Sequence, residues 1–160
     1  MENISGKTAE LFQLSCSVGA FESGTSERFA KKAGDIGLSI GMAFQIIDDI
    51  LDYTKESQEI GKPVLEDMRQ GVYSLPLIYS LQKNKQSLLP YLEKKTEMTE
   101  EDIEAVRKIV ERTGGVGEAK KLAAAYTEKA LKEIKKLPDT SLRTRENLFS
   151  LTQLILDRKD

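Results

Sequence analysis

Near the end of its longest apolar pattern the chain reads Phe44-Gln45-Ile46-Ile47-Asp48-Asp49-Ile50-Leu51-Asp52. Residues three or four positions apart lie on the same face of an α-helix. On such a helix the polar face holds Gln45, Asp48, Asp49 and Asp52, and the apolar face holds Phe44, Ile47 and Leu51. The run therefore predicts a helix that is packed on one side and strongly acidic on the other.

Three carboxylates on one helical face repel one another, by about 1 kcal/mol per pair in water at 4 Å and by up to ~4 kcal/mol where screening is weaker. A hard divalent cation offsets this repulsion, because Mg²⁺ prefers oxygen ligands and is usually held by one or two carboxylates together with substrate phosphates. A solvated acidic face is the alternative interpretation. The apolar character of the helix and the amide of Gln45, one turn earlier, favour a magnesium site.

The pattern on either side predicts an all-α protein, because apolar residues recur at helical spacing and strand-like alternation is absent. Helices are expected at about 4–21, 25–53, 74–81, after Ser87, and at about 99–112, 116–136 and 140–157. Between the second and third of these, residues 54–71 are polar, and a loop of this length is often functional. Glycines at 34, 37 and 41 predict a helix or a ligand packed closely against the long helix.

Composition restricts the possible functions. The 160 residues, 39% hydrophobic and 31% charged, predict a single all-helical domain over 1–160. A net charge of -2 disfavours nucleic-acid binding, and the lack of histidine excludes Ser-His and Cys-His catalysis. The single Cys16 cannot form an internal disulfide, and its apolar neighbours predict a buried thiol in a reducing, cytoplasmic setting. No apolar run approaches the roughly 20 residues of a spanning helix, so no transmembrane segment is expected.

The motif resembles a known family. Phe44-Gln45-x-x-Asp48-Asp49-x-x-Asp52, followed by Gly61-Lys62-Pro63, Asp67 and Leu75-Pro76, is similar to the second aspartate-rich motif and following loop of trans-isoprenyl (polyprenyl) diphosphate synthases. Heptaprenyl and related medium- or long-chain bacterial enzymes are the most similar members. Upstream, Gly6-Lys7-Thr8-Ala9-x-Leu11-Phe12 and Cys16-x-x-Gly19-Ala20 resemble the preceding helix. The resemblance covers residues 3 to about 82.

The resemblance implies the carboxy-terminal half of the isoprenoid synthase helical bundle and a prenyltransferase activity. Such enzymes condense isopentenyl diphosphate with an allylic diphosphate by Mg²⁺-assisted ionisation. Residue by residue, it implies that Asp48, Asp49 and Asp52 hold the metal and that Lys7 and Lys62 bind the allylic diphosphate. Lys7, Thr8 and Gln45 would line the reacting centre.

The chain also departs from the family. It contains no first aspartate-rich motif and no following Arg-Arg pair, and it has about half the family's length. We therefore expect a fragment that is inactive by itself. Leu65 and Glu66 stand between Gly61-Lys62-Pro63 and Asp67, where the family commonly has a glycine and a small residue. Two alternatives stay open: a non-catalytic partner subunit of a heteromeric synthase, and a terpene cyclase-like domain.

Association is expected as well. A fragment of a helical bundle exposes faces that are otherwise packed, and large exposed apolar patches are uncommon on monomers. We expect an open apolar stripe through Phe29, Ile36, Ile40 and Ile47, and a homodimer formed through it.

Overall fold

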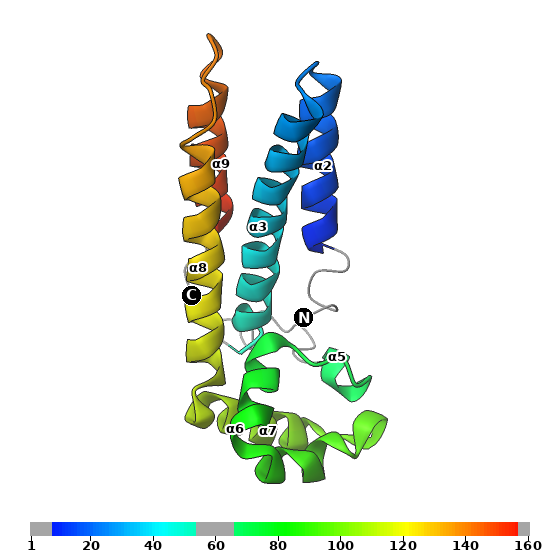
Figure 1. Cartoon of the computed structure of the whole chain (residues 1–160). Helices are drawn as coiled ribbons and strands as arrows, with labels where there is room; N and C mark the ends of the chain where they lie inside the picture. Colours follow the sequence, from blue (N-terminus) through cyan, green and yellow to red (C-terminus); the bar gives the residue numbers. More distant parts are fainter. Residues whose placement is uncertain (1–7, 54–65, 157–160) are drawn as a thin grey trace. The chain divides into compact units, whose positions relative to one another are not determined.

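The structure, a computed structural model, describes residues 8–53 and 66–156, and every regular element in these ranges is helical (Figure 1). The elements are α2 (Glu10–Glu22), α3 (Glu27–Leu51), α5 (Glu66–Arg69), α6 (Leu75–Leu92), the 3₁₀ turn η2 (Lys95–Glu97), α7 (Glu100–Thr113), α8 (Gly115–Ile134) and α9 (Thr144–Leu156). The all-α prediction is confirmed. In the described part of the chain, no helix has the length and hydropathy needed to cross a bilayer.

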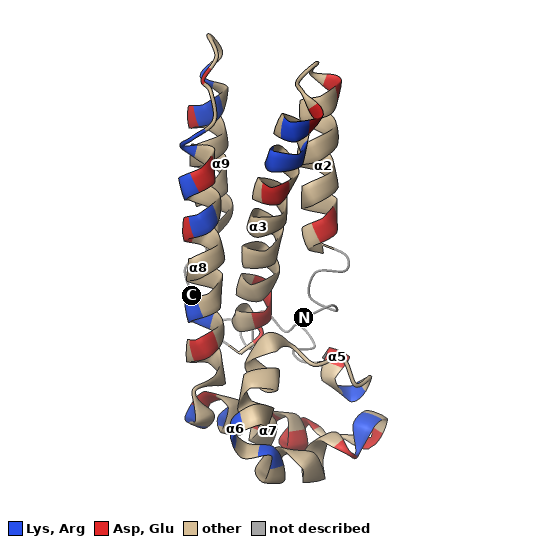
Figure 2. Ribbon diagram, viewed as in Figure 1, with Lys and Arg blue, Asp and Glu red and all other residues tan. Residues whose placement is uncertain are grey.

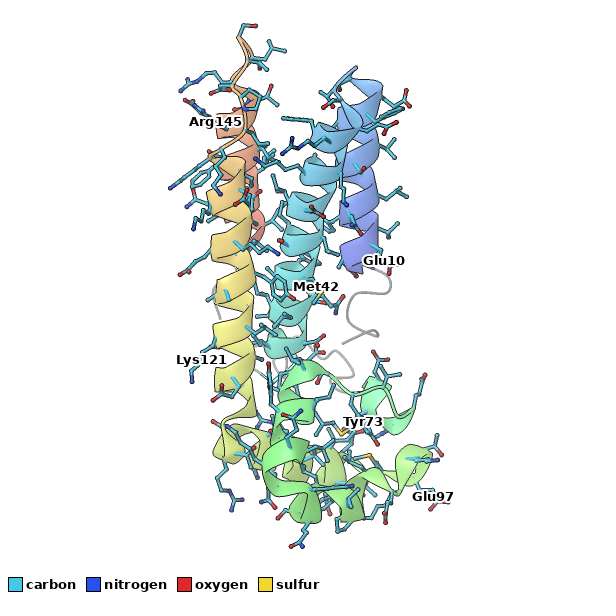
Figure 3. All side chains as sticks on the ribbon, viewed as in Figure 1. Glu10, Met42, Tyr73, Glu97, Lys121 and Arg145 are labelled. Carbon is cyan, nitrogen blue, oxygen red and sulfur yellow. The ribbon has the colours of Figure 1, made fainter. Side chains whose placement is uncertain are left out.

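The chain is organised as two compact units. The first contains residues 1–47 and 122–159, and the second contains residues 48–121. Helices α2 and α9 belong to the first unit and α5, α6 and α7 to the second, whereas α3 and α8 each begin in one unit and end in the other. Side chains fill the space around these helices, including the buried Met42 of α3 (Figure 3).

In the first unit, α2 lies directly against a glycine face of α3. A Cβ atom added at Gly37 would lie 2.4 Å from the carbonyl oxygen of Phe12 and 2.9 Å from Cys16 Sγ. One added at Gly41 would lie 2.6 Å from the Cα of Ala9. All three distances are well below van der Waals contact, so only glycine fits at either position. The close neighbour predicted from the glycine spacing is therefore the helix α2.

The apolar stripe expected to be open is instead packed within the first unit. Ile36 and Ile40 are only 3% and 4% exposed and form a core cluster with Ala130 and Ile134 of α8, and the prediction of an open face through them is wrong. Phe29 and Ile47 are half-buried. The reason is that side chains of the carboxy-terminal helices α8 and α9 pack against this stripe.

The exposed large apolar side chains of this unit lie on α2 and in the segment 142–154. Four of them form one stripe at helical spacing, with exposed fractions of 63% at Leu11, 60% at Leu14, 47% at Val18 and 53% at Phe21. Cys16 is half-buried rather than buried, and burial raises the pKa of its thiol. Its apolar sequence neighbours gave a misleading signal, because residues two positions apart on a helix point in nearly opposite directions.

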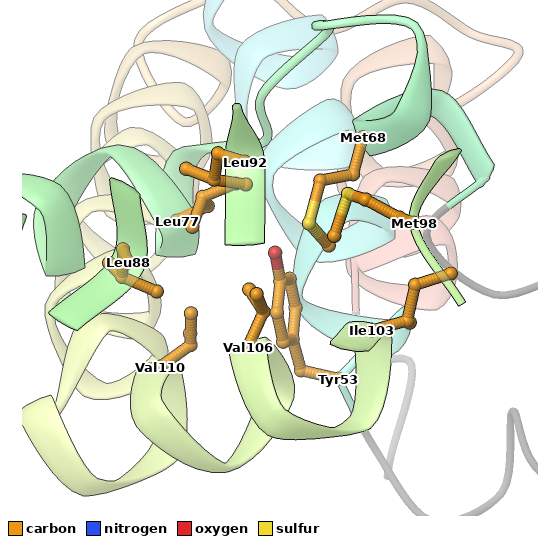
Figure 4. Close-up of a cluster of buried hydrophobic side chains, with 9 residues drawn as sticks. All are labelled: Tyr53, Met68, Leu77, Leu88, Leu92, Met98, Ile103, Val106 and Val110. Carbon is orange, nitrogen blue, oxygen red and sulfur yellow. The ribbon is translucent and has the colours of Figure 1, made fainter. Parts of the chain in front are cut away.

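The second unit packs around its own apolar cluster (Figure 4). Its members come from α5, α6 and α7 and from the residues just after α3 and η2, and they are Tyr53, Met68, Leu77, Leu88, Leu92, Met98, Ile103, Val106 and Val110. The two helices expected on either side of residue 84 form one element, α6, with a break at Asn84 (φ -146°, ψ 62°). The Asn84 side chain accepts a hydrogen bond from the Ser87 amide at 3.4 Å, which starts the second segment. Pro76 lies in the first turn.

Helix α7 has both ends that its sequence predicts. Thr99 and Asp102 form a capping box, in which Thr99 Oγ1 accepts from the Asp102 amide and Asp102 Oδ2 accepts from the Thr99 amide. Lys94 Nζ donates to Asp102 Oδ1 at 2.6 Å, and this bond is the main cause that lowers the pKa of Asp102. The helix ends at Gly114, whose φ of 76° is left-handed.

The glycine contact can be tested by a pair of substitutions. Gly37→Ala is expected to lower the free energy of unfolding by about 1–3 kcal/mol, because the new methyl group meets backbone that cannot move aside. Gly19→Ala is the matched control, since nothing lies within 4 Å of a Cβ at that position of α2, and it is expected to raise stability by up to about 1 kcal/mol. Urea unfolding followed by circular dichroism measures both. Equal effects of the two substitutions would contradict the close packing.

Candidate functional site

The aspartate motif occupies the carboxy-terminal end of α3. Asp48 and Asp49 lie in its last turn and Asp52 in the turn that follows, where acidic residues gather at this end of the helix (Figure 2). Asp48 and Asp52 are exposed, whereas Asp49 is half-buried. The side chains of Asp48 and Asp52, one turn apart, are therefore both in contact with solvent.

Asp49 has a specific protein contact. Its Oδ2 accepts a hydrogen bond from the backbone amide of Leu75, the first residue of α6, at 3.1 Å. Beside it, the Tyr53 hydroxyl and Ser74 Oγ are 2.9 Å apart and share a second hydrogen bond. These two bonds join the end of α3 to the start of α6. Neither Tyr53 nor Ser74 was predicted as part of the site.

Tyr53 is 8% exposed, and its pKa is raised well above the ordinary value for tyrosine. Burial is the main cause, and the negative charges of Asp49 and Asp52 act in the same direction, while the hydrogen bond with Ser74 opposes them. The hydroxyl therefore stays protonated and keeps a hydrogen atom for bonding at physiological pH. The sequence signal that could have found Ser74 is its place directly before the helix that contains Pro76.

The first unit brings two other predicted residues together. The Thr8 hydroxyl donates to Gln45 Oε1 at 2.9 Å, across 37 positions of sequence. In the same unit, the rings of Phe12 and Phe44 pack with their centroids 5.9 Å apart. The two residues predicted to bind the diphosphate, Lys7 and Lys62, lie outside the described residues.

The donor chemistry of the site suits a hard cation. Searched over residues 8–53 and 66–156, the structure holds no group of three or more His, Cys, Asp or Glu side chains that could bind a metal ion by themselves. Mg²⁺ needs fewer protein ligands, since one or two carboxylates commonly hold it together with substrate phosphates and water. The oxygen donors of Asp48 and Asp52 fit that requirement.

A groove of about 680 Å³ runs along the α2–α3 pair within the first unit. Leu14, Val18 and Phe21 of the exposed stripe form one wall, and small residues of α3, Ala30 and Gly34, lie opposite. Charged residues also line it: Glu10, Glu22, Glu27 and Lys31. The groove is therefore lined by both apolar and polar side chains.

Comparison with known proteins places the chain in a family. Residues 1–112 match the polyprenyl synthetase family model. The chain is 34% identical over 163 aligned residues to heptaprenyl diphosphate synthase component 2 of Bacillus subtilis. The alignment covers 99% of this chain and 45% of the relative. The chain therefore belongs to the polyprenyl synthetase family.

Solved structures agree. The geranylgeranyl pyrophosphate synthase of Lactobacillus brevis, complexed with citrate, matches with a TM-score of 0.88 and 47% identity over 98% of this chain and 50% of that one. A polyprenyl synthase of Caulobacter crescentus, complexed with calcium and isoprenyl diphosphate, matches with a TM-score of 0.83 and 31% identity over 99% of this chain and 49% of that one. The chain thus spans about half the length of the relatives it matches.

Proposed function

We propose that this chain is the carboxy-terminal, metal-binding part of a trans-prenyltransferase that makes polyprenyl diphosphates. The observation that carries the proposal is the aspartate motif at the end of α3, with Asp48 and Asp52 exposed, in a chain of the polyprenyl synthetase family. The Caulobacter relative was solved with a divalent cation and an isoprenyl diphosphate, the two ligands that such a motif suits. The substrates proposed here are isopentenyl diphosphate and an allylic prenyl diphosphate.

In this reaction the C–O bond to the allylic diphosphate breaks, the double bond of isopentenyl diphosphate attacks the allylic carbon, and a proton is lost. Mg²⁺, when bound, would supply positive charge that stabilises the departing diphosphate. Asp48 and Asp52 would hold the ion, and Asp49 belongs to the same aspartate motif. Lys7 and Lys62 would add point charges to the diphosphate by analogy with the family.

We propose that Thr8 and Gln45 act on the developing positive charge and not on the metal. The Thr8 hydroxyl already donates to Gln45 Oε1, and this bond fixes the orientation of the amide. Oriented hydroxyl and amide dipoles stabilise developing positive charge without having to reorganise during the reaction. We assign the pair to the neighbourhood of the reacting carbons, together with Lys7.

We further propose that the chain alone is inactive, because it spans about half of its relatives and contains one aspartate-rich motif. The Bacillus relative is named as one component of a synthase, which favours assembly with another chain as a second candidate. In a purely non-catalytic partner subunit, three retained aspartates would have no evident use. The relatives reported above are prenyl diphosphate synthases, so they do not favour a terpene cyclase.

For the chain by itself we propose a homodimer in a cytoplasmic setting, formed through α2. The stripe of Leu11, Leu14, Val18 and Phe21 is exposed to solvent. Three of its residues also line the groove, and small residues of α3 line the opposite side. In a two-fold arrangement, the stripe of each copy can enter the groove of the other, so both apolar surfaces are buried at once. Four exposed large apolar side chains in one row are unusual on a monomer.

The metal assignment predicts a large effect at Asp48. In a full-length synthase whose carboxy-terminal half is this chain, Asp48→Asn is expected to lower turnover by about 100-fold or more, because charge stabilisation of the leaving group is lost. Incorporation of labelled isopentenyl diphosphate measures it, and the far-ultraviolet circular dichroism should stay unchanged. Glu101→Gln, an exposed carboxylate in the first turn of α7, is the control for the loss of one charge. Turnover of Asp48→Asn within twofold of the unaltered enzyme would remove Asp48 from the metal site.

The dimer proposal predicts the behaviour of the chain in solution. Light scattering at micromolar concentration is expected to give twice the mass of one chain. Replacing Leu14 and Val18 together by Lys should give a monomer with the same helical content, because two charges cannot be buried in an apolar interface. Leu154→Lys is the matched control, since Leu154 is 74% exposed on α9 of the same unit and should not affect the mass. A monomeric unaltered chain would contradict the proposal.

A further inference from the structure

The start of α6 has an unusual cap. Ser74 has the extended backbone of an N-cap residue (φ -70°, ψ 160°), but its side chain makes no capping hydrogen bond. Pro76, one residue into the helix, has no amide hydrogen to offer. The amide of Leu75 is therefore the first donor of the helix that needs a partner, and its partner is Asp49 Oδ2, 26 positions earlier in the chain.

The hydroxyl that would ordinarily cap the helix is used elsewhere. Ser74 Oγ bonds the Tyr53 hydroxyl at 2.9 Å. Tyr53 is buried in the apolar cluster of the second unit, so this bond has a fixed anchor. Asp49, Tyr53, Ser74 and Leu75 all belong to that one unit. Two hydrogen bonds from the end of α3 thus hold the first residue of α6 and the residue before it.

The three aspartates consequently differ in their surroundings. Asp48 and Asp52 are exposed and lie four positions apart, on the same side of the helix. Asp49 is half-buried and projects about 100° away from Asp48, toward the start of α6. A helix amino terminus carries partial positive charge and attracts a carboxylate, so this contact is favourable in itself.

Building on the proposed function, we propose that Asp49 is a positioning residue of the aspartate motif and not a third equivalent metal ligand. Its carboxylate holds the first amide of α6 and thereby fixes the end of α3, from which Asp48 and Asp52 present their oxygens to a divalent cation. The bond also relieves crowding within the motif, because it directs one of three like charges toward a positive partner. The motif then works as two ligands and one structural link.

Two substitutions of Asp49 separate these roles. Asp49→Asn and Asp49→Ala remove the same charge, but only the carboxamide oxygen of Asn can still accept from the Leu75 amide. Binding of Mn²⁺ to the chain, followed by electron paramagnetic resonance, is expected to be about tenfold weaker in Asp49→Ala than in Asp49→Asn, as for other residues that orient metal ligands. Exchange of the Leu75 amide with deuterium should accelerate in Asp49→Ala and stay slow in Asp49→Asn. Asp48→Asn, by contrast, should lose Mn²⁺ affinity while the Leu75 amide remains protected.

The outcomes distinguish the inference from the proposed function. Equal losses of Mn²⁺ affinity in Asp49→Asn, Asp49→Ala and Asp48→Asn would make Asp49 an ordinary ligand and overturn the positioning role. A second outcome would also overturn the positioning role. If the Leu75 amide exchanges faster in Asp49→Ala but the two Asp49 variants bind Mn²⁺ equally, Asp49 caps α6 without affecting the metal ligands. Failure of the unaltered chain to bind Mn²⁺, both alone and with inorganic pyrophosphate, would contradict the proposed function itself. Glu101→Gln again controls for the loss of one negative charge in the same unit.

Discussion

The contact of α2 with the glycine face of α3 is the constraint on which the first unit depends. At Gly37 and Gly41 the backbone of α2 comes so near that no side chain can fit between the helices. Glycine inside a helix costs up to ~1 kcal/mol relative to alanine, so the close contact must more than offset that cost. The same contact sets the distance at which Thr8 on one side can reach Gln45 on the other. A packing requirement therefore also supports a hydrogen bond between two residues that we propose for the site.

In the second unit the main constraint is electrostatic repulsion, because three aspartates lie close together at the end of α3. Like charges that close together oppose folding unless something neutralises them. One favourable contact is that of Asp49 with the amino terminus of α6, and the side chains of Asp48 and Asp52 are exposed. A bound divalent cation, held together with a diphosphate, would reduce the repulsion further. We therefore infer that the negative charge of the aspartates serves to bind the cation.

Much of this could be predicted from the sequence, where local rules decide the outcome. The capping box at Thr99 and Asp102, the end of α7 at Gly114 and the close approach at Gly37 follow from residue types whose backbone or hydrogen-bonding preferences are strong. The pairing of Thr8 with Gln45 was expected only in outline, from the resemblance to a family. The burial of Ile36 and Ile40 could not be predicted, because it depends on the distant helix α8. Nor could the cap that Asp49 gives to α6, since side-chain bonds across 26 positions leave no periodic signal.

The central claim is that the aspartate end of α3 binds a divalent cation together with a diphosphate. Nuclear magnetic resonance of the ¹⁵N-labelled chain, titrated with Mg²⁺ and inorganic pyrophosphate separately and together, tests it most directly. The account predicts amide shifts that centre on Asp48, Asp49 and Asp52 and on the start of α6, and that are much larger with both ligands than with either alone, because Mg²⁺ is held jointly by carboxylates and phosphates. Shifts spread evenly over the surface, or centred on other acidic residues such as those in the first turn of α7, would contradict it.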